Sequence, residues 1–332
     1  MENTKNKDYA ISLIRLIATG FIVSCHMMQF RDSVFAWWFN VGVQIFLCMS
    51  GFLYGTRGRI ENGPKFVLKQ WGKILLDYYI VVIPAFIVYC IFAKENVSLL
   101  KAKEVLLTYG YLYGGEHLWF IPYILICYAV TPFLSYLFNR GEGKKNGWVM
   151  ALTLILTAGI FESVGSYFNA AWIICFVVGF LLGHAWKFDK KAYVRGCIIV
   201  IISAVALNTF QIRQDYIPSA YVFLPEPFGS HYYRIQNYAH VALGVSLFVT
   251  LKAFFTLLFR KGTPKFIQKL GDLSDKLSYD IYLVHQFFIL GPFTLMELTG
   301  SLAVNILVIV VIAISLGVLV HFISGKLRKL FA

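Results

Sequence analysis

Long apolar runs dominate this chain, and they recur along its length between short polar connections. Hydrophobic residues make up 58% of the 332 residues, whereas charged residues make up only 14%. A water-soluble chain of this length needs more polar residues to cover its surface, and the mean hydropathy of +0.68 is correspondingly high. The apolar runs therefore predict an all-α polytopic membrane protein.

The lengths of the apolar runs predict how many helices cross the membrane. A spanning helix needs about 20 mainly apolar residues. On this measure we predict about ten transmembrane helices, which form a single integral membrane domain over residues 1–332. Their expected positions are 9–30, 34–55, 74–93, 118–139, 148–164, 170–187, 194–212, 237–258, 279–298 and 301–324.

The basic residues predict how these helices are oriented. Most of the 30 Lys and Arg residues lie in alternate connections, and cytoplasmic connections are the ones that carry excess Lys and Arg. The pattern predicts that both termini are cytoplasmic and that the number of spans is even. The same distribution explains the net charge of +13, so the charge does not indicate that the protein binds nucleic acid. We expect a protein of the lipid bilayer, in a bacterial cytoplasmic membrane.

The first apolar run, LIRLIATGFIVSCH at 13–26, contains two residues that are costly in a bilayer, Arg15 and His26. Eleven helical positions are close to three full turns, so both residues share one helix face, about 16 Å apart along the axis. Burying an arginine in a span costs about 2.5 to 3.5 kcal/mol, so such residues usually face a cavity or a partner. The alternative is that Arg15 reaches the headgroups and His26 makes one structural hydrogen bond.

Four stretches resemble the acyltransferase family 3 membrane proteins. The Arg-to-His spacing in the first helix is similar to the family's first signature. The later stretches match its Ser-Gly-Phe, Trp-Phe and Ser-Tyr-x-x-Tyr-Leu-x-His segments in the family's order. They are FLCMSGFLYG (46–55), HLWFIPYILICYAVTPFL (117–134) and LSYDIYLVHQFF (277–288).

This resemblance implies an enzyme that takes an acyl group from acyl-CoA on the cytoplasmic side. It implies an acceptor hydroxyl on the outer side, usually on a cell-envelope or exported saccharide, and His26 as the central catalytic residue. Histidine titrates in the useful range for a general base acting on a hydroxyl. Arg15 then serves as a fixed charge on the path of CoA, and we expect the transferred group to be acetyl.

The family's basic pair, Arg-x-x-Arg at the start of helix three, is altered in this chain. The corresponding stretch is KQWGKILLDYY, so Lys73 replaces the second arginine, and Gln70 stands at the first with Lys69 beside it. Lysine holds a phosphate as a point charge but lacks the bidentate guanidinium fork. We expect Lys69 and Lys73 to contact CoA, assisted by Arg57 and Arg59, although cytoplasmic topology alone also explains the two arginines.

Three residues at the predicted outer mouth are candidates for binding the acceptor or assisting His26. Glu116 is a candidate catalytic residue, and His117 and Trp119 are candidate substrate-binding residues. Polar and aromatic residues at a helix entrance are also typical of an ordinary membrane interface. In the late motif, His285 is expected near CoA, the alternative being a packing histidine.

The sequence leaves four points open: the acceptor, the acyl chain, the oligomeric state, and whether the acyl group is transferred directly or through a covalent acyl-enzyme. The scattered histidines and cysteines, without HExxH or CxxC spacing, predict no metal site. The main alternative function is a membrane transporter or small-molecule binding module that uses the same polar pathway. A catalytically silent sensor is a third possibility, which the presence of both Arg15 and His26 disfavours.

Overall fold

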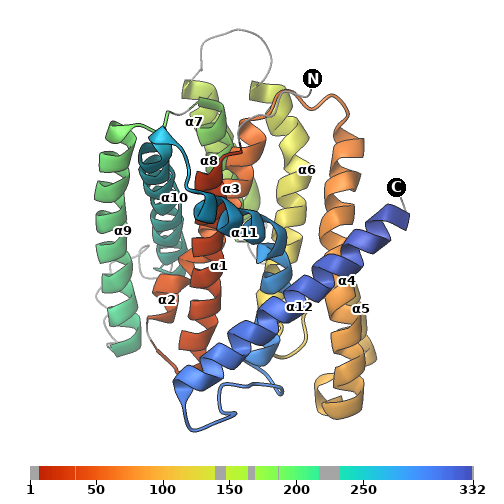
Figure 1. Ribbon diagram of the computed structural model, residues 1–332. Coiled ribbons are helices and arrows are strands. Elements are labelled where there is room, and N and C mark those ends of the chain that lie inside the picture. The colour runs from red at the N-terminus through yellow and green to blue at the C-terminus, as the bar shows by residue number, and fades with distance from the viewer. Residues whose placement is uncertain are drawn as a thin grey trace. The chain divides into compact units, whose positions relative to one another are not determined.

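The computed structural model describes most of the chain, and every regular element in the described part is a helix (Figure 1). The described residues are 7–33, 35–138, 147–163, 169–185, 187–216 and 232–330. The α-helices are α1 (Tyr9–Phe30), α2 (Ala36–Phe39), α3 (Val41–Gly55), α4 (Gly63–Phe92), α5 (Leu99–Leu106), α6 (Phe120–Phe138), α7 (Gly147–Ser163), α8 (Ala170–Ala185), α9 (Lys190–Tyr216), α10 (Tyr232–Leu258), α11 (Lys265–Val284) and α12 (Leu302–Leu330). Short 3-10 helices are η1 (Lys94–Asn96), η2 (Glu116–Trp119), η4 (Phe259–Lys261) and η5 (His285–Phe288).

Within the described residues, five helices are long and apolar enough to cross a membrane. They are Tyr9–Phe30, Gly63–Phe92, Glu116–Phe138, Gln236–Lys261 and Leu302–Leu330. Two further apolar helices are shorter, Val41–Gly55 and Ala170–His184. The all-helical class is confirmed, whereas ten spans with both termini cytoplasmic stays a prediction.

The helix predicted over 279–298 is wrong. The chain is helical earlier, in α11 from Lys265 to Val284, then passes through η5 and an irregular segment before α12 begins at Leu302. Gly291 has a φ of +89°, which favours glycine, and Pro292 follows it. A proline cannot donate a backbone hydrogen bond, so this pair prevents a continuous helix.

Two other boundaries also differ from the sequence prediction. The predicted helix 34–55 is divided into α2 and α3, and α4 begins at Gly63 rather than at 74. The side chain of Asn62 accepts a hydrogen bond from the backbone N–H of Lys65, at 2.9 Å, and caps the early start of α4. Hydropathy detects the apolar part of a helix but not its polar first turns, so the predicted start at 74 is too late.

By its internal contacts the chain divides into two compact units. The first comprises Met1–Phe21, Trp37–Arg59 and Leu134–Asp272, and the second comprises Ile22–Ala36, Ile60–Phe133 and Leu273–Ala332. Each contains its own apolar core: Ile14, Ile45 and Phe248 are buried in the first, and Ile289, Met296 and Ile309 in the second.

In the first unit, α3 and α8 lie against each other through glycines. Gly51 and Gly55 in α3, and Gly179 and Gly183 in α8, each stand four residues apart. A Cβ atom on Gly51 would lie 1.9 Å from the carbonyl oxygen of Phe176. Small residues with this spacing let two membrane helices approach backbone to backbone.

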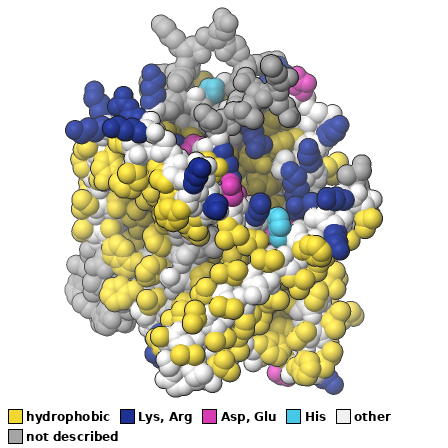
Figure 2. All heavy atoms as spheres, in the orientation of Figure 1, with side chains coloured by type: hydrophobic (Ala, Val, Ile, Leu, Met, Phe, Trp, Pro, Cys, Tyr) yellow, Lys and Arg dark blue, Asp and Glu magenta, His cyan; other side chains and the backbone are white. Residues whose placement is uncertain are grey.

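In the second unit, α12 packs against α4. On the face shown in Figure 2, apolar side chains cover much of α12, and Lys and Arg side chains gather toward its C-terminal end, where the last turn contains Arg328 and Lys329. An apolar helix with a basic end is typical of a membrane span whose basic end lies at the cytoplasmic surface.

Candidate active site

Three histidines from three separate elements of the second unit converge. His26 comes from the last turns of α1, His117 from η2 and His285 from the start of η5. The centroid of the His285 ring lies 5.2 Å from that of His26 and 5.0 Å from that of His117. The His26 and His117 rings are 6.1 Å apart. We call these three residues the histidine cluster.

The hydrogen bonds of the cluster fix which ring nitrogen carries the proton. The Nδ1 of His285 lies 2.8 Å from the carbonyl oxygen of Tyr282, and the Nε2 of His117 lies 3.2 Å from that of Leu283. A carbonyl oxygen only accepts, so each of these nitrogens donates and the other ring nitrogen has a lone pair. The Nδ1 of His26 lies 2.6 Å from Oε1 of Gln29, which assigns the lone pair of His26 to Nε2.

Two of these lone pairs have no partner within the described part of the protein. The side chains of His117 and His285 are buried, with 2% and 0% exposure, and the Nδ1 of His117 and the Nε2 of His285 make no hydrogen bond there. Buried polar atoms are nearly always hydrogen-bonded, because an unpaired one loses its interaction with water. These two nitrogens are therefore suited to accept hydrogen bonds from a bound molecule.

A buried polar network holds His117 in place. Gln286 accepts a hydrogen bond from the His117 backbone N–H at 3.1 Å and donates one to the Glu116 carboxylate at 2.9 Å. Glu116 also accepts from the backbone N–H of Gly114 at 2.9 Å, and the Tyr282 hydroxyl donates to the carbonyl of His117. Glu116 thus supports the loop that contains His117, and Gln29 is the residue that orients His26.

The remaining candidate residues are not members of the cluster. Trp119 is half-buried and packs edge-on against Tyr123, with ring centroids 5.4 Å apart. Arg15 is partly buried in α1, in the stretch that belongs to the first unit, and its carbonyl accepts from Thr19. The helix places Arg15 about 16 Å from His26 along its axis.

The basic candidates are at the surface of their units. In the first unit, Arg57 lies over the ring of Tyr54 at 4.8 Å and Arg59 over that of Tyr136 at 5.6 Å. In the second, Lys69 and Lys73 are exposed on α4, four residues apart and so on one helix face.

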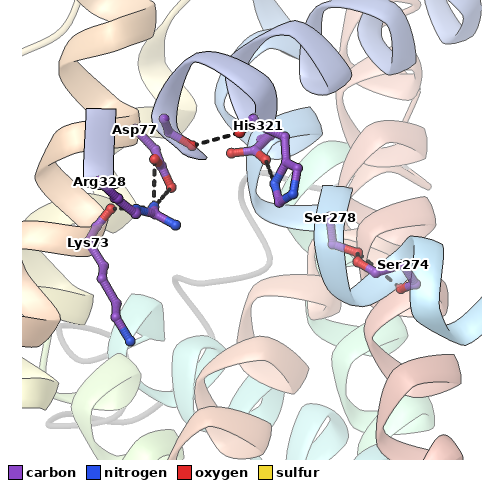
Figure 3. A network of polar contacts seen from close by, with 8 residues as sticks. Lys73, Asp77, Ser274, Ser278, His321 and Arg328 are labelled. Atoms are coloured by element: carbon purple, nitrogen blue, oxygen red, sulfur yellow. Dashed lines mark hydrogen bonds and ion pairs between the residues drawn. The ribbon is translucent and has the colours of Figure 1, made fainter. Parts of the chain in front are cut away.

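A second polar network in this unit joins α4, α11 and α12 (Figure 3). Arg328 donates from Nη2 to both carboxylate oxygens of Asp77, at 2.7 and 2.6 Å, and also to the backbone carbonyl of Lys73. His321 faces the carboxylate of Asp280 at 3.2 Å. The network fixes the end of α12 against the part of α4 that contains Lys73.

The sequence interpretation missed Gln29, Gln286, Asp280 and Arg328. Gln286 directly follows His285, and Gln29 is one helical turn after His26, so proximity to those histidines was the available signal. No such signal existed for Arg328, whose partner Asp77 is 251 positions away in the chain. Among the described residues, no group of three or more His, Cys, Asp and Glu side chains is arranged to hold a metal ion.

The apolar helices that are long enough to span a membrane define a class, the helical integral membrane proteins. The comparison of sequences is more specific. A family model described as an acyltransferase domain matches residues 8–324, so the chain belongs to acyltransferase family 3. No curated protein and no solved structure matched the chain.

Proposed function

We propose that the protein is a membrane O-acyltransferase that moves an acetyl group from cytoplasmic acetyl-CoA to a hydroxyl of a cell-envelope or exported saccharide. The observation that carries this proposal is the histidine cluster, in which three imidazoles converge and two of them have buried ring nitrogens without a hydrogen bond in the described part of the protein. Membership in the acyltransferase family supports the type of reaction.

The reaction assigns His26 as the general base. Its Nε2 takes the proton of the acceptor hydroxyl while the hydroxyl oxygen attacks the thioester carbon. A C–O bond forms, the C–S bond breaks, and the proton passes to the sulfur of the departing CoA. The hydrogen bond from Nδ1 to Gln29 supports this role, because it keeps the lone pair on Nε2.

The other candidate residues bind and orient the two substrates. His285, next to His26, binds the donor at its thioester end, while Lys69, Lys73, Arg57, Arg59 and Arg15 attract its phosphates. His117 and Trp119 bind the acceptor, and Glu116 holds the loop of His117 through Gln286. Lysine and arginine attract phosphates through charge, and arginine also through its planar fork.

Purified protein in vesicles, supplied with radiolabelled acetyl-CoA and host saccharide, tests the proposal. His26→Gln is expected to lower acyl transfer by about 10²- to 10⁴-fold, the usual contribution of a general base. His184→Ala is the matched control, since His184 is half-buried at the end of α8 and lies outside the cluster. The control is expected to retain full activity.

Two results would overturn the proposal. Full transfer by the His26→Gln protein would exclude His26 as the base. Passage of an unmodified solute across the vesicle membrane, without any acyl transfer, would instead establish the alternative, a transporter. Comparing the masses of host glycans with and without the protein identifies both the acyl group and its acceptor.

A further inference from the structure

A cavity of about 670 Å³ lies in the second unit, between α4 and α12 and beside η5. Its lining on α4 extends from Ile80 to Tyr89, about 13 Å along the helix axis. A methylene-sized group occupies on the order of 30 Å³, the share of one water molecule in the liquid, so the cavity holds about 20 such groups. These dimensions fit a hydrocarbon chain.

The lining offers almost no polar atom to a ligand. It is built mainly from aliphatic and aromatic side chains, and its two hydroxyl groups are already bonded within the protein. Tyr89 donates to the carbonyl of Tyr113 at 2.5 Å, and Thr294 donates to the carbonyl of Ile289 at 2.8 Å. The part of a molecule that enters this cavity must therefore be apolar.

The side chain of Phe287 contacts both the cavity and the histidine cluster. Phe287 lines the cavity, and its ring lies 5.8 Å from the ring of His117, in an edge-on contact. Gln286 precedes Phe287 in the chain, and His117 contacts the Phe287 ring. Both residues belong to the polar network that supports the cluster. An apolar chain in the cavity and a polar group at the histidines can thus belong to one molecule.

The cavity opens at an exposed apolar surface of α4 and α12. Its walls α4 and α12 are both candidate membrane spans. Among the lining residues, Val88, Leu319 and Ile323 are 40%, 50% and 36% exposed. A molecule that resides in the bilayer reaches such an opening by lateral diffusion, whereas a water-soluble thioester arrives from the aqueous side.

We propose that this cavity binds the hydrocarbon chain of a lipid-anchored acceptor, so that the hydroxyl compound is modified while it is attached to its membrane anchor. The inference rests on the proposed function and narrows its acceptor to amphiphiles. The hydrocarbon chain of the acceptor lies in the cavity, and the headgroup of the acceptor extends past Phe287 to the histidine cluster.

Photolabelling tests the cavity without requiring acyl transfer. Protein in vesicles is irradiated with dodecyl β-D-glucoside that bears a diazirine on its chain, and the labelled peptides are mapped. Label is expected in 80–89 of α4 and 316–323 of α12. Phosphatidylcholine with the same diazirine is the comparison, and equal labelling by both probes would overturn the proposal, because the cavity would then hold ordinary bilayer lipid.

Variants that fill the cavity provide a second test. Ala85→Trp places a large side chain in the cavity, whereas Ile91→Trp places the same side chain at an exposed position of α4 outside the lining. Ala85→Trp is expected to reduce labelling by the glucoside about tenfold, the effect of losing roughly two buried methylene groups, and Ile91→Trp to leave it unchanged. Leu316→Trp also fills the cavity, and it replaces Ala85→Trp in this test if the Ala85→Trp protein does not fold.

Kinetics with defined acceptors separate this inference from the proposed function. Ala85→Trp is expected to raise KM for dodecyl glucoside and to leave KM for acetyl-CoA and methyl glucoside unchanged. If it raises KM only for a long-chain acyl-CoA, the cavity binds the donor's acyl chain and the inference is overturned. If labelling maps to the cavity but the protein acylates neither these glucosides nor host saccharide, the cavity is confirmed as an amphiphile site and the proposed function fails by itself.

Discussion

Single hydrogen bonds decide the chemistry available to the histidine cluster. Each of its imidazoles donates one ring N–H to a named acceptor, Gln29 for His26, Leu283 for His117 and Tyr282 for His285. In two of the three, the acceptor is a backbone carbonyl, which no substitution removes. His26 depends on a side chain, so the assignment of its lone pair is open to a direct test.

Replacing Gln29 tests the orientation of His26. Gln29→Leu removes the acceptor of the His26 Nδ1–H, so the ring is free to rotate and to place its proton on Nε2. We expect kcat to fall at least tenfold while KM for acetyl-CoA changes little. Gln29→Glu keeps an acceptor oxygen and is expected to restore most of kcat.

Gln268→Leu is the control for this measurement. Gln268 is on α11, whereas Gln29 is on α1, and the Gln268 side chain donates to the carbonyl of Thr263. Replacing Gln268 is therefore expected to leave kcat unchanged. Because Gln29 is exposed, loss of folding is not expected in either variant. Equal kcat in Gln29→Leu and the unmodified protein would contradict the role of Gln29 in orienting His26.

Pairs of helices are held together by two different kinds of contact. The pair α3 and α8 approaches through glycines, so its stability depends on the absence of side chains. The pair α4 and α12 is joined by the ion pair of Asp77 and Arg328, so it depends on two side chains that must be present together. Each kind of contact predicts a different response to substitution.

A methyl group at the glycine contact is expected to separate α3 from α8. The Cβ of Gly51→Ala would lie 1.9 Å from a backbone oxygen that cannot move alone, so we expect severe loss of folded protein in detergent. Gly159→Ala on α7 is the control, because no atom lies within 4 Å of its Cβ. Alanine favours helix over glycine by about 0.5 to 1 kcal/mol, so the control is expected to be neutral or slightly more stable in a thermal unfolding assay.

The ion pair predicts a non-additive double mutant. Asp77 is buried, so Arg328→Met leaves an uncompensated carboxylate and Asp77→Leu leaves a guanidinium without its partner. We expect each single variant to lower Tm, and the double variant to be more stable than the sum of the two losses predicts, because it removes both charges. Strictly additive losses would show that the two side chains do not interact energetically.

An exposed ion pair provides the comparison for this cycle. Lys7 and Asp272 are 2.5 Å apart, but their side chains are 40% and 46% exposed. Exposed pairs contribute about 0 to 1 kcal/mol, so Asp272→Asn is expected to change Tm little. The contrast separates the effect of burial from the effect of charge alone.

At the scale of the whole molecule, the distribution of basic residues predicts the orientation in the membrane. Excess Lys and Arg in alternate connections predicts that both termini are cytoplasmic. We expect a green fluorescent protein fused to the C-terminus to fluoresce and alkaline phosphatase at the same position to be inactive. Alkaline phosphatase inserted at Asn96, in a predicted outer connection, is expected to be active.

These fusions also test the number of spans. An even number is required if both termini lie on the same side, so active phosphatase at the C-terminus with a cytoplasmic N-terminus would contradict the prediction. Five helices among the described residues satisfy the length and hydropathy of a span, and two shorter apolar helices, α3 and α8, lie where the sequence predicts further spans.

The sequence by itself determined the helical membrane class, the first helix at 9–30 with Arg15 and His26 on it, and the motifs that identify the family. These are local properties, because hydropathy, helical periodicity and short motifs depend on neighbouring residues. The prediction of a helix over 279–298 fails for the same reason, because hydropathy detects the apolar run but not the turn at Gly291 and Pro292.

Only the tertiary structure decided which side chains meet. His117 and His285 are 168 positions apart in the chain, yet their rings lie 5.0 Å from each other, and Arg328 pairs with a carboxylate on a distant helix. Such contacts depend on how helices pack, which is set by glycine contacts, ion pairs and the shape of apolar side chains rather than by local pattern. The same packing leaves the apolar cavity beside the histidines, which no property of the linear sequence indicates.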